Sequence, residues 1–304
     1  IIKMGGGYHG WSDQMVYGMR VPGTGRRDAV GIPRANTSKI HESFPHDLAA
    51  LRRKLQLNRL SGGTAAVIVE PVGPESGTRP VQKNFNAELR SLCDEFCCLL
   101  IFDEVVTGFR LGLSGAQGYF GVMPDLTVLG KCITGGYPMA GALGGRKEIM
   151  MNLAGGIGGS KKGAMVGGTL SANPLSCAAG YHTILEMERT QAAQHAGRAG
   201  DRLRRGLEGI INRLGLPYVV YNQGSIVHLQ TSGVMLLNAN TLLRKLRTLK
   251  EAMPRKHMME EFGAAYSAHG IITLAGSRIY TSLADTDEVI DDALNRFEDV
   301  MKLV

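Results

Sequence analysis

The chain has 304 residues, of which 44% are hydrophobic and 20% are charged. This composition excludes a disordered chain and allows one large domain with a smaller one beside it. The net charge of +7 is scattered without a dense basic run interleaved with aromatic residues, so we expect no nucleic-acid partner. No apolar run approaches the roughly 18 residues of a membrane span, so we also expect no membrane partner.

The five cysteines are odd in number and show no spacing typical of a metal site, and no secretory signal is visible. These features favour a reducing compartment, so we expect a cytoplasmic protein without a metal. The chain does not begin with Met and starts inside an apparent strand. We therefore expect that its N-terminal part is missing.

The opening stretch IIKMGGGYHGW places Gly5, Gly7 and Gly10 in a G-x-G-x-x-G pattern. A dinucleotide-binding loop needs a strand before the pattern and a helix directly after it. The apolar start can form the strand, but glycines and prolines interrupt the next 23 residues, so no helix is predicted there. The alternative is a glycine-rich loop that presents Tyr8 and His9 to a ligand.

Three apolar runs follow, over residues 64–71, 97–104 and 125–131. Between the first two, apolar residues recur at helical spacing: Phe85, Leu89, Leu92, Cys93 and Phe96. Continuously apolar strands around a helix indicate a βαβ unit in a buried parallel sheet. Glu70, Asp103 and Lys131 stand at the ends of these strands, where ligands bind in such sheets.

The rest of the chain alternates helices with a pair of strands. Pro174 opens a helix that runs to about Glu188, and a second helix has an apolar face made by Ala196, Ala199, Leu203, Leu207 and Ile210. Two strands flank residues 222–224, and the last helix begins at Thr286 or Asp287. We therefore expect a large α/β domain over residues 1–185 and a smaller α+β domain over 186–304.

A lysine at a strand end is usually a surface residue, but its amine can also form a Schiff base with pyridoxal phosphate. That cofactor needs an acid for its ring nitrogen, an aromatic and an apolar contact for its two faces, and donors for its phosphate. In addition to Lys131, the chain contains a candidate for each requirement: the acid Asp103, the aromatic Tyr8, the apolar Val105 and the polar stretch GGTLSANP. A nucleotide loop would not explain this set.

The segments IFDEVVTGFR, GAQGYFGVMPDLTVLGKCITGGYPMAGALGG and GGTLSANPLSCAAG closely resemble the class III aminotransferases. The resemblance covers nearly the whole chain and is strongest to the branch that contains glutamate-1-semialdehyde aminomutase. It implies fold type I, with a mostly parallel central sheet flanked by helices and a smaller C-terminal α+β domain. It also implies pyridoxal 5'-phosphate as the cofactor.

The resemblance also implies residue roles. Lys131 matches the Schiff-base lysine, and Asp103 matches the carboxylate that pairs with the ring nitrogen. Tyr8 matches the stacked ring with His9 beside it, and Val105 matches the apolar contact on the other face. Thr169, with the Gly168 amide, matches a phosphate contact that the neighbouring subunit makes. Glu70 matches a glutamate near the edge of the cofactor.

The activity implied is transamination between an amino donor and a small keto acid or aldehyde, by a homodimer with shared active sites. Three alternatives stay open: an aminomutase, an amino-acid racemase and a non-catalytic relative. The family's Gly-(Ser/Thr)-Glu-Ala phosphate loop would precede Ile1, and Val106 stands where many relatives have glutamine. The sequence therefore does not define the substrate.

Overall fold

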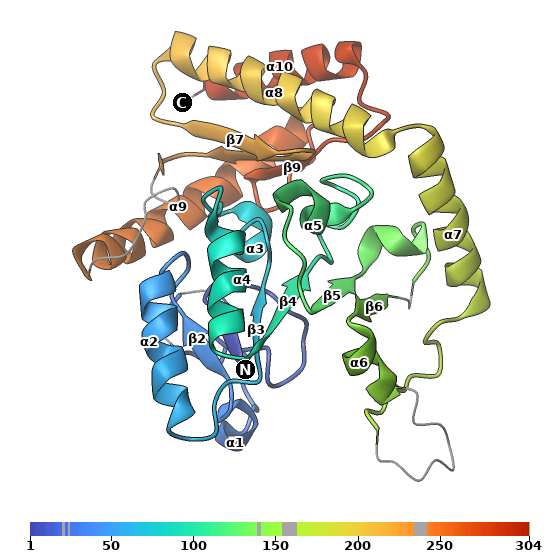
Figure 1. Ribbon diagram of the computed structural model, residues 1–304. Coiled ribbons are helices and arrows are strands. Elements are labelled where there is room, and N and C mark those ends of the chain that lie inside the picture. Colours follow the sequence, from blue (N-terminus) through green and yellow to red (C-terminus); the bar gives the residue numbers. More distant parts are fainter. Residues whose placement is uncertain (20–21, 24, 139–140, 154–162, 234–241, 304) are drawn as a thin grey trace.

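The computed structural model describes residues 1–19, 22–23, 25–138, 141–153, 163–233 and 242–303. Two sheets, one above the other in Figure 1, divide the strands between them. The six-stranded sheet contains β1 (Ile2–Met4), β2 (His41–Ser43), β3 (Ala66–Val69), β4 (Leu99–Asp103), β5 (Leu126–Leu129) and β6 (Ala142–Gly145). The three-stranded sheet contains β7 (Val219–Gln223), β8 (Ile226–Gln230) and β9 (Arg278–Tyr280).

Helices connect these strands. Those of the first half are α1 (Arg34–Thr37), α2 (Leu48–Arg59), α3 (Pro74–Gly77), α4 (Phe85–Glu95), α5 (Gly115–Phe120), the 3₁₀ helix η1 (Lys131–Thr134), α6 (Lys147–Met150) and the 3₁₀ helix η2 (Met151–Leu153). Those of the second half are α7 (Pro174–Arg189), α8 (Ala192–Leu214), α9 (Leu242–Ala268) and α10 (Asp287–Met301).

The large sheet has the strand order β2-β1-β3-β4-β5-β6, and every neighbouring pair is parallel except β5 with β6. One face of the sheet packs against α2 and α4. The buried side chains of this core include Ile2, Val67, Leu100 and Phe102 from the strands and Leu51, Leu55, Leu89 and Leu92 from the two helices. The predicted βαβ unit of apolar strands around a helix is confirmed.

The small sheet is antiparallel and packs against α8, α9 and α10. The predicted apolar face of α8 is confirmed, because all five of its residues are buried. Thr286 caps α10 by accepting from the amide of Val289, as the sequence predicts. The buried residues of α10 include Ile290, Phe297 and Val300, whereas Val289 is exposed.

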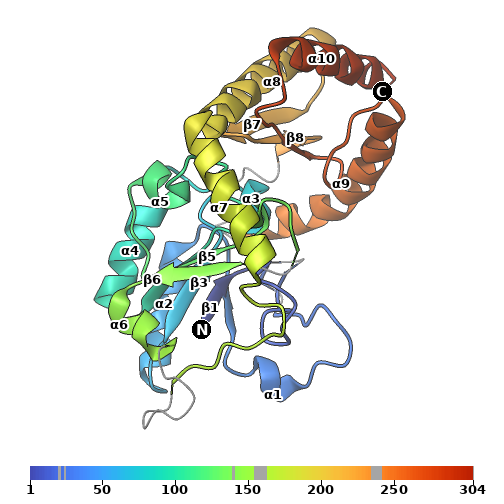
Figure 2. The ribbon, with the colours of Figure 1, turned by 90° about the vertical axis from the view of Figure 1, so that its right-hand side faces the viewer.

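Polar contacts join the small sheet to the turn that follows β3. The hydroxyl of Tyr221 in β7 donates to the carbonyl of Thr78 at 2.7 Å, and the guanidinium of Arg278 in β9 pairs with the carboxylate of Glu75 at 2.9 Å. Figure 2 shows α7 passing the β6 side of the large sheet and leading into α8. The expected domain boundary at residue 185 falls inside α7 and stays a prediction.

Candidate functional site

The strand order brings four predicted site positions to one edge of the large sheet. β1, β3, β4 and β5 are consecutive neighbours and run parallel, so their carboxyl ends meet at the same edge. His9 follows β1, Glu70 follows β3, Asp103 ends β4 and Lys131 follows β5. Residues that are far apart in sequence are therefore assembled by the sheet itself.

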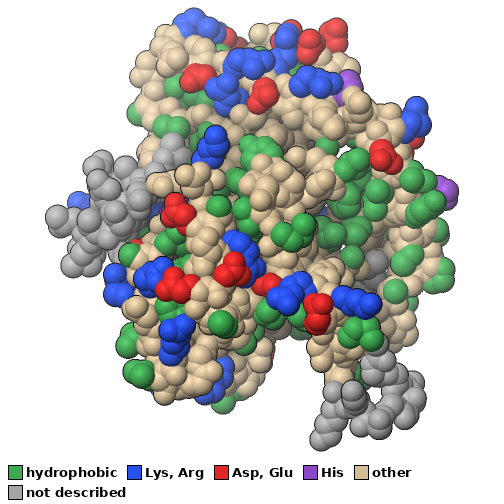
Figure 3. Space-filling model, in the orientation of Figure 1, with side chains coloured by type: hydrophobic (Ala, Val, Ile, Leu, Met, Phe, Trp, Pro, Cys, Tyr) green, Lys and Arg blue, Asp and Glu red, His purple; other side chains and the backbone are tan. Residues whose placement is uncertain are grey.

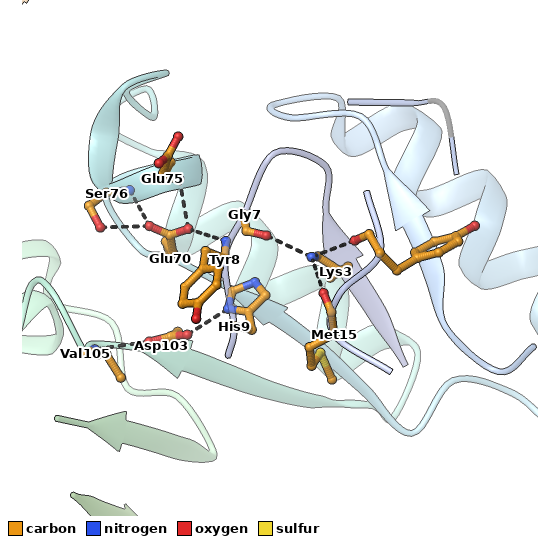
Figure 4. A network of polar contacts seen from close by, with 11 residues as sticks. Lys3, Gly7, Tyr8, His9, Met15, Glu70, Glu75, Ser76, Asp103 and Val105 are labelled. Carbon is orange, nitrogen blue, oxygen red and sulfur yellow. Dashed lines mark hydrogen bonds and ion pairs between the residues drawn. The ribbon is translucent and has the colours of Figure 1, made fainter. Parts of the chain in front are cut away.

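Asp103 is the best-anchored of these groups. Its Oδ2 lies 2.7 Å from Nδ1 of His9, and its Oδ1 accepts from the amide of Val105 at 3.1 Å (Figure 4). The two paired side chains are 9% and 1% exposed, so water has little access to the contact. With Nδ1 donating, the imidazole fixes one carboxylate oxygen and the main chain fixes the other. Nε2 of His9 is buried and has no partner among the described residues.

Tyr8 differs from its neighbour by being open to solvent. It is 52% exposed, while its main-chain amide donates to Oε1 of Glu70 at 2.9 Å. The backbone of Tyr8 is thus fixed, and its ring is available at the sheet edge. No helix follows the glycine pattern until α1 at Arg34, so the described residues do not form a dinucleotide-binding loop.

Glu70 is held by donors from both sides. Oε1 also accepts from the amide of Glu75 at 2.8 Å, and Oε2 accepts from the amide and the hydroxyl of Ser76. Glu75 and Ser76 have φ angles of 48° and 50°, a left-handed pair that turns successive amides toward one acceptor. Burial raises the pKa of Glu70, against the opposing effect of His9 and these donors. Glu70 joins the Tyr8 loop to the turn after β3.

Lys131 is exposed and begins η1, separated from the end of β5 by Gly130. Its φ angle of 50° lies in the left-handed region, which is costly for a residue with a side chain and is compatible with a functional position. The preceding Gly130 lies against Val105, because a Cβ at Gly130 would stand 3.2 Å from Cγ1 of Val105. Val105, two residues after Asp103, therefore lies against the residue that precedes Lys131.

Thr169 and Gly168 lie apart from this group. Both are exposed, and the described main-chain bonds tie Gly168 to Ser171 and not to the sheet edge. Four residues on, Asn173 caps α7 by accepting from the amide of Ser176 at 2.9 Å. Six of the eight predicted residues therefore gather at the edge, and these two do not.

One charged residue near the site was not predicted from the sequence. Lys3 is fully buried in β1, and its ammonium donates to three carbonyls in the loop that carries Tyr8 and His9 (Figure 4). The available signal was a lysine in the middle of an otherwise apolar strand, where charged side chains are rare.

No cluster of three or more metal-binding side chains occurs among the residues that the structure describes. Within the same part of the chain, no helix has the length and apolar character required to cross a membrane. The expected cytoplasmic location stays a prediction.

With this geometry in place, the comparisons with known proteins identify the family. The sequence matches the family described as aminotransferase class-III over residues 1–301. A glutamate-1-semialdehyde 2,1-aminomutase of Macrococcus caseolyticus is 34% identical over 311 residues, which cover 100% of this chain and 68% of that protein. The chain belongs to the class-III aminotransferase family.

Solved structures agree with this assignment. An ω-transaminase from Sphaerobacter thermophilus has a TM-score of 0.84 and 25% identity, with 99% of this chain and 68% of that chain covered. A glutamate-1-semialdehyde aminomutase from Pseudomonas aeruginosa, in complex with PMP, shares the fold with a TM-score of 0.78 and 24% identity, covering 99% of this chain and 65% of that one. The predicted fold type I architecture is confirmed, and the chain spans about two thirds of the length of these relatives.

Proposed function

We propose that the protein binds pyridoxal 5'-phosphate and transfers an amino group between an amine or amino acid and a keto acid or aldehyde. The observation that carries this proposal is the buried carboxylate of Asp103, held by His9 and Val105 on the strand next to Lys131. A carboxylate fixed in this way suits a protonated ring nitrogen, and an exposed amine suits an aldehyde. The residues present therefore fit the cofactor that the family implies.

Each residue has a task that follows from its position. Asp103 holds a proton on the ring nitrogen, and His9 keeps the carboxylate in place. Tyr8 offers its exposed ring to one face of the cofactor and Val105 offers its methyl groups to the other. When bound, the cofactor would accept the electron pair that remains on a substrate carbon after that carbon loses a proton. The amine of Lys131 would remove that proton from the substrate carbon and carry it to the C4′ carbon of the cofactor.

Intramolecular transfer, as in glutamate-1-semialdehyde 2,1-aminomutase, is the second candidate. It is favoured by the name of the 34% identical relative, which covers the whole of this chain. The same residues serve both reactions. An aminomutase converts its substrate without a second keto acid, whereas a transaminase needs one. A racemase would invert the α-carbon without moving nitrogen, and a non-catalytic relative would do none of these.

A direct test of the proposal uses Lys131→Ala with Lys147→Ala as the control, because Lys147 is an exposed lysine on α6. Borohydride should fix the cofactor covalently to wild type and to Lys147→Ala, and Lys131→Ala should lose both this fixation and amino transfer. Each protein is treated with borohydride, digested and examined by mass spectrometry. Covalent fixation to Lys131→Ala at the wild-type level would overturn the assignment.

We propose further that a second copy of the chain completes the site. Apolar side chains are exposed around the segment that carries Thr169, and Figure 3 shows hydrophobic side chains gathered along α7. They include Met165, Val166, Leu170, Leu175, Tyr181 and Leu185, which are 44% to 95% exposed. A homodimer that covers this face would bring Thr169 and Gly168 of one subunit to the cofactor phosphate of the other.

A further inference from the structure

Lys3 is a buried charge to which the proposed chemistry gives no task. It lies in the middle of β1 and is 0% exposed. Its Nζ donates to the carbonyls of Gly7 at 2.8 Å, Met15 at 3.2 Å and Tyr17 at 2.8 Å. An ammonium group has three N–H donors, so these three carbonyls use all of them.

The three carbonyls belong to the two arms of the loop that carries Tyr8 and His9 into the candidate site. Gly7 directly precedes Tyr8 and His9 (Figure 4). Met15 and Tyr17 follow them in the chain, on the returning arm of the loop. The described residues between β1 and Met15 form neither helix nor strand. A main-chain bond from Gly6 to the carbonyl of Gly18 joins the two arms of the loop, and the donors of Lys3 pair three further carbonyls of the loop.

Carboxylates surround the same ammonium and hold further main-chain groups. Glu42 accepts from the amides of Gly23 and Gly25, Asp28 accepts from the amide of Met19 at 2.8 Å, and Glu70 accepts from the amide of Tyr8. Burial lowers the pKa of Lys3 to about 8, and the charges of these three carboxylates act in the opposite direction. The ammonium and these three carboxylates therefore together hold main-chain groups on both arms of the loop.

We infer that Lys3 is a positioning residue for the proposed reaction, holding the loop so that His9 reaches Asp103 and Tyr8 presents its ring at the sheet edge. The inference rests on the proposed function for its effect on catalysis. Its structural part, the fixing of the loop by Lys3, stands on the three hydrogen bonds alone.

Lys3→Met tests the inference because methionine fills a similar volume and donates nothing. Lys54→Met is the matched control, since Lys54 also donates to a main-chain carbonyl, that of Glu42, but outside the loop. Trp11, the only tryptophan in the chain, lies inside the loop and is 86% exposed, so its fluorescence anisotropy reports loop motion without the cofactor.

Lys3→Met should show lower Trp11 anisotropy than wild type, weaker visible circular dichroism of bound cofactor, and turnover reduced by about 100-fold, the scale of a misplaced catalytic group. Lys54→Met should resemble wild type in all three. If Lys3→Met does not fold, the same comparison is made with Lys3→Gln, which keeps two N–H donors and should lie between the two.

The inference is wrong if the folded Lys3 variant keeps the anisotropy and dichroism of wild type, or changes them no more than Lys54→Met does. Failure of wild type to hold cofactor or transfer amino groups would defeat the proposed function instead. In that event the anisotropy measurement still decides whether Lys3 fixes the loop.

Discussion

His9→Leu removes the donor that holds Asp103 and leaves an apolar side chain of comparable size. The contact it breaks is 2.7 Å long between side chains that are 1% and 9% exposed, so water cannot readily replace it. A hydrogen bond to a charged group contributes about 1.5–3 kcal/mol. Since each 1.36 kcal/mol or so of activation free energy changes a rate about tenfold, amino transfer should fall by about 10- to 150-fold.

Two further variants define the range of this measurement. His9→Asn can place an amide N–H near the position of Nδ1 and should retain activity within a few-fold of wild type. Asp103→Asn cannot keep a proton on the ring nitrogen and should be the slowest of the three while still binding cofactor. The kcat of each is measured at saturating cofactor, with circular dichroism to check the fold. If His9→Leu were as active as wild type, or His9→Asn as slow as His9→Leu, the role given to the contact would be refuted.

Two other predictions concern stability and assembly. Burial, with a smaller effect of Arg79, lowers the pKa of His46 from 6.5 to about 4. Between these values the unfolded chain binds a proton that the folded chain does not, so the free energy of unfolding should fall by about 3 kcal/mol as the pH drops from 6.5 to 4. Urea titrations should show this loss in wild type and not in His46→Gln; equal losses would contradict it. Mixing inactive Lys131→Ala with Thr169→Ala chains should give activity above either parent if subunits share sites, and a mixture no better than the parental average would count against sharing.

The sequence predicted the central strands of the large sheet because their signals are local, whereas the edge strands β2 and β6 were not predicted. Apolar runs predict β3, β4 and β5, and helical spacing predicts α4 and α8, since each pattern reports burial within one element. The carboxyl-end positions of Glu70, Asp103 and Lys131 then follow from the geometry of parallel strands. The helix α9 was not predicted; it contains Pro254, a residue that normally argues against a helix interior.

The contacts that organise the site could not be predicted in the same way. His9 and Asp103 are 94 positions apart, and their pairing depends on β1 lying two strands from β4. The amides offered to Glu70 depend on the left-handed backbone of Glu75 and Ser76, neither of which is a glycine. The role inferred for Lys3 depends on the orientation of three main-chain carbonyls, which cannot be inferred from the types of the residues that carry them.

The arrangement also explains why residue substitutions alone will not separate the two candidate reactions. Under the proposed function, transfer to a second molecule and transfer within one molecule would both use the amine of Lys131 and the carboxylate of Asp103, which lie at the same edge of the large sheet. A variant at either position should therefore stop both reactions together. What differs between the reactions is whether nitrogen leaves with one product or returns to the same carbon skeleton. A ¹⁵N-labelled donor, followed into product with and without an added keto acid, measures that difference directly.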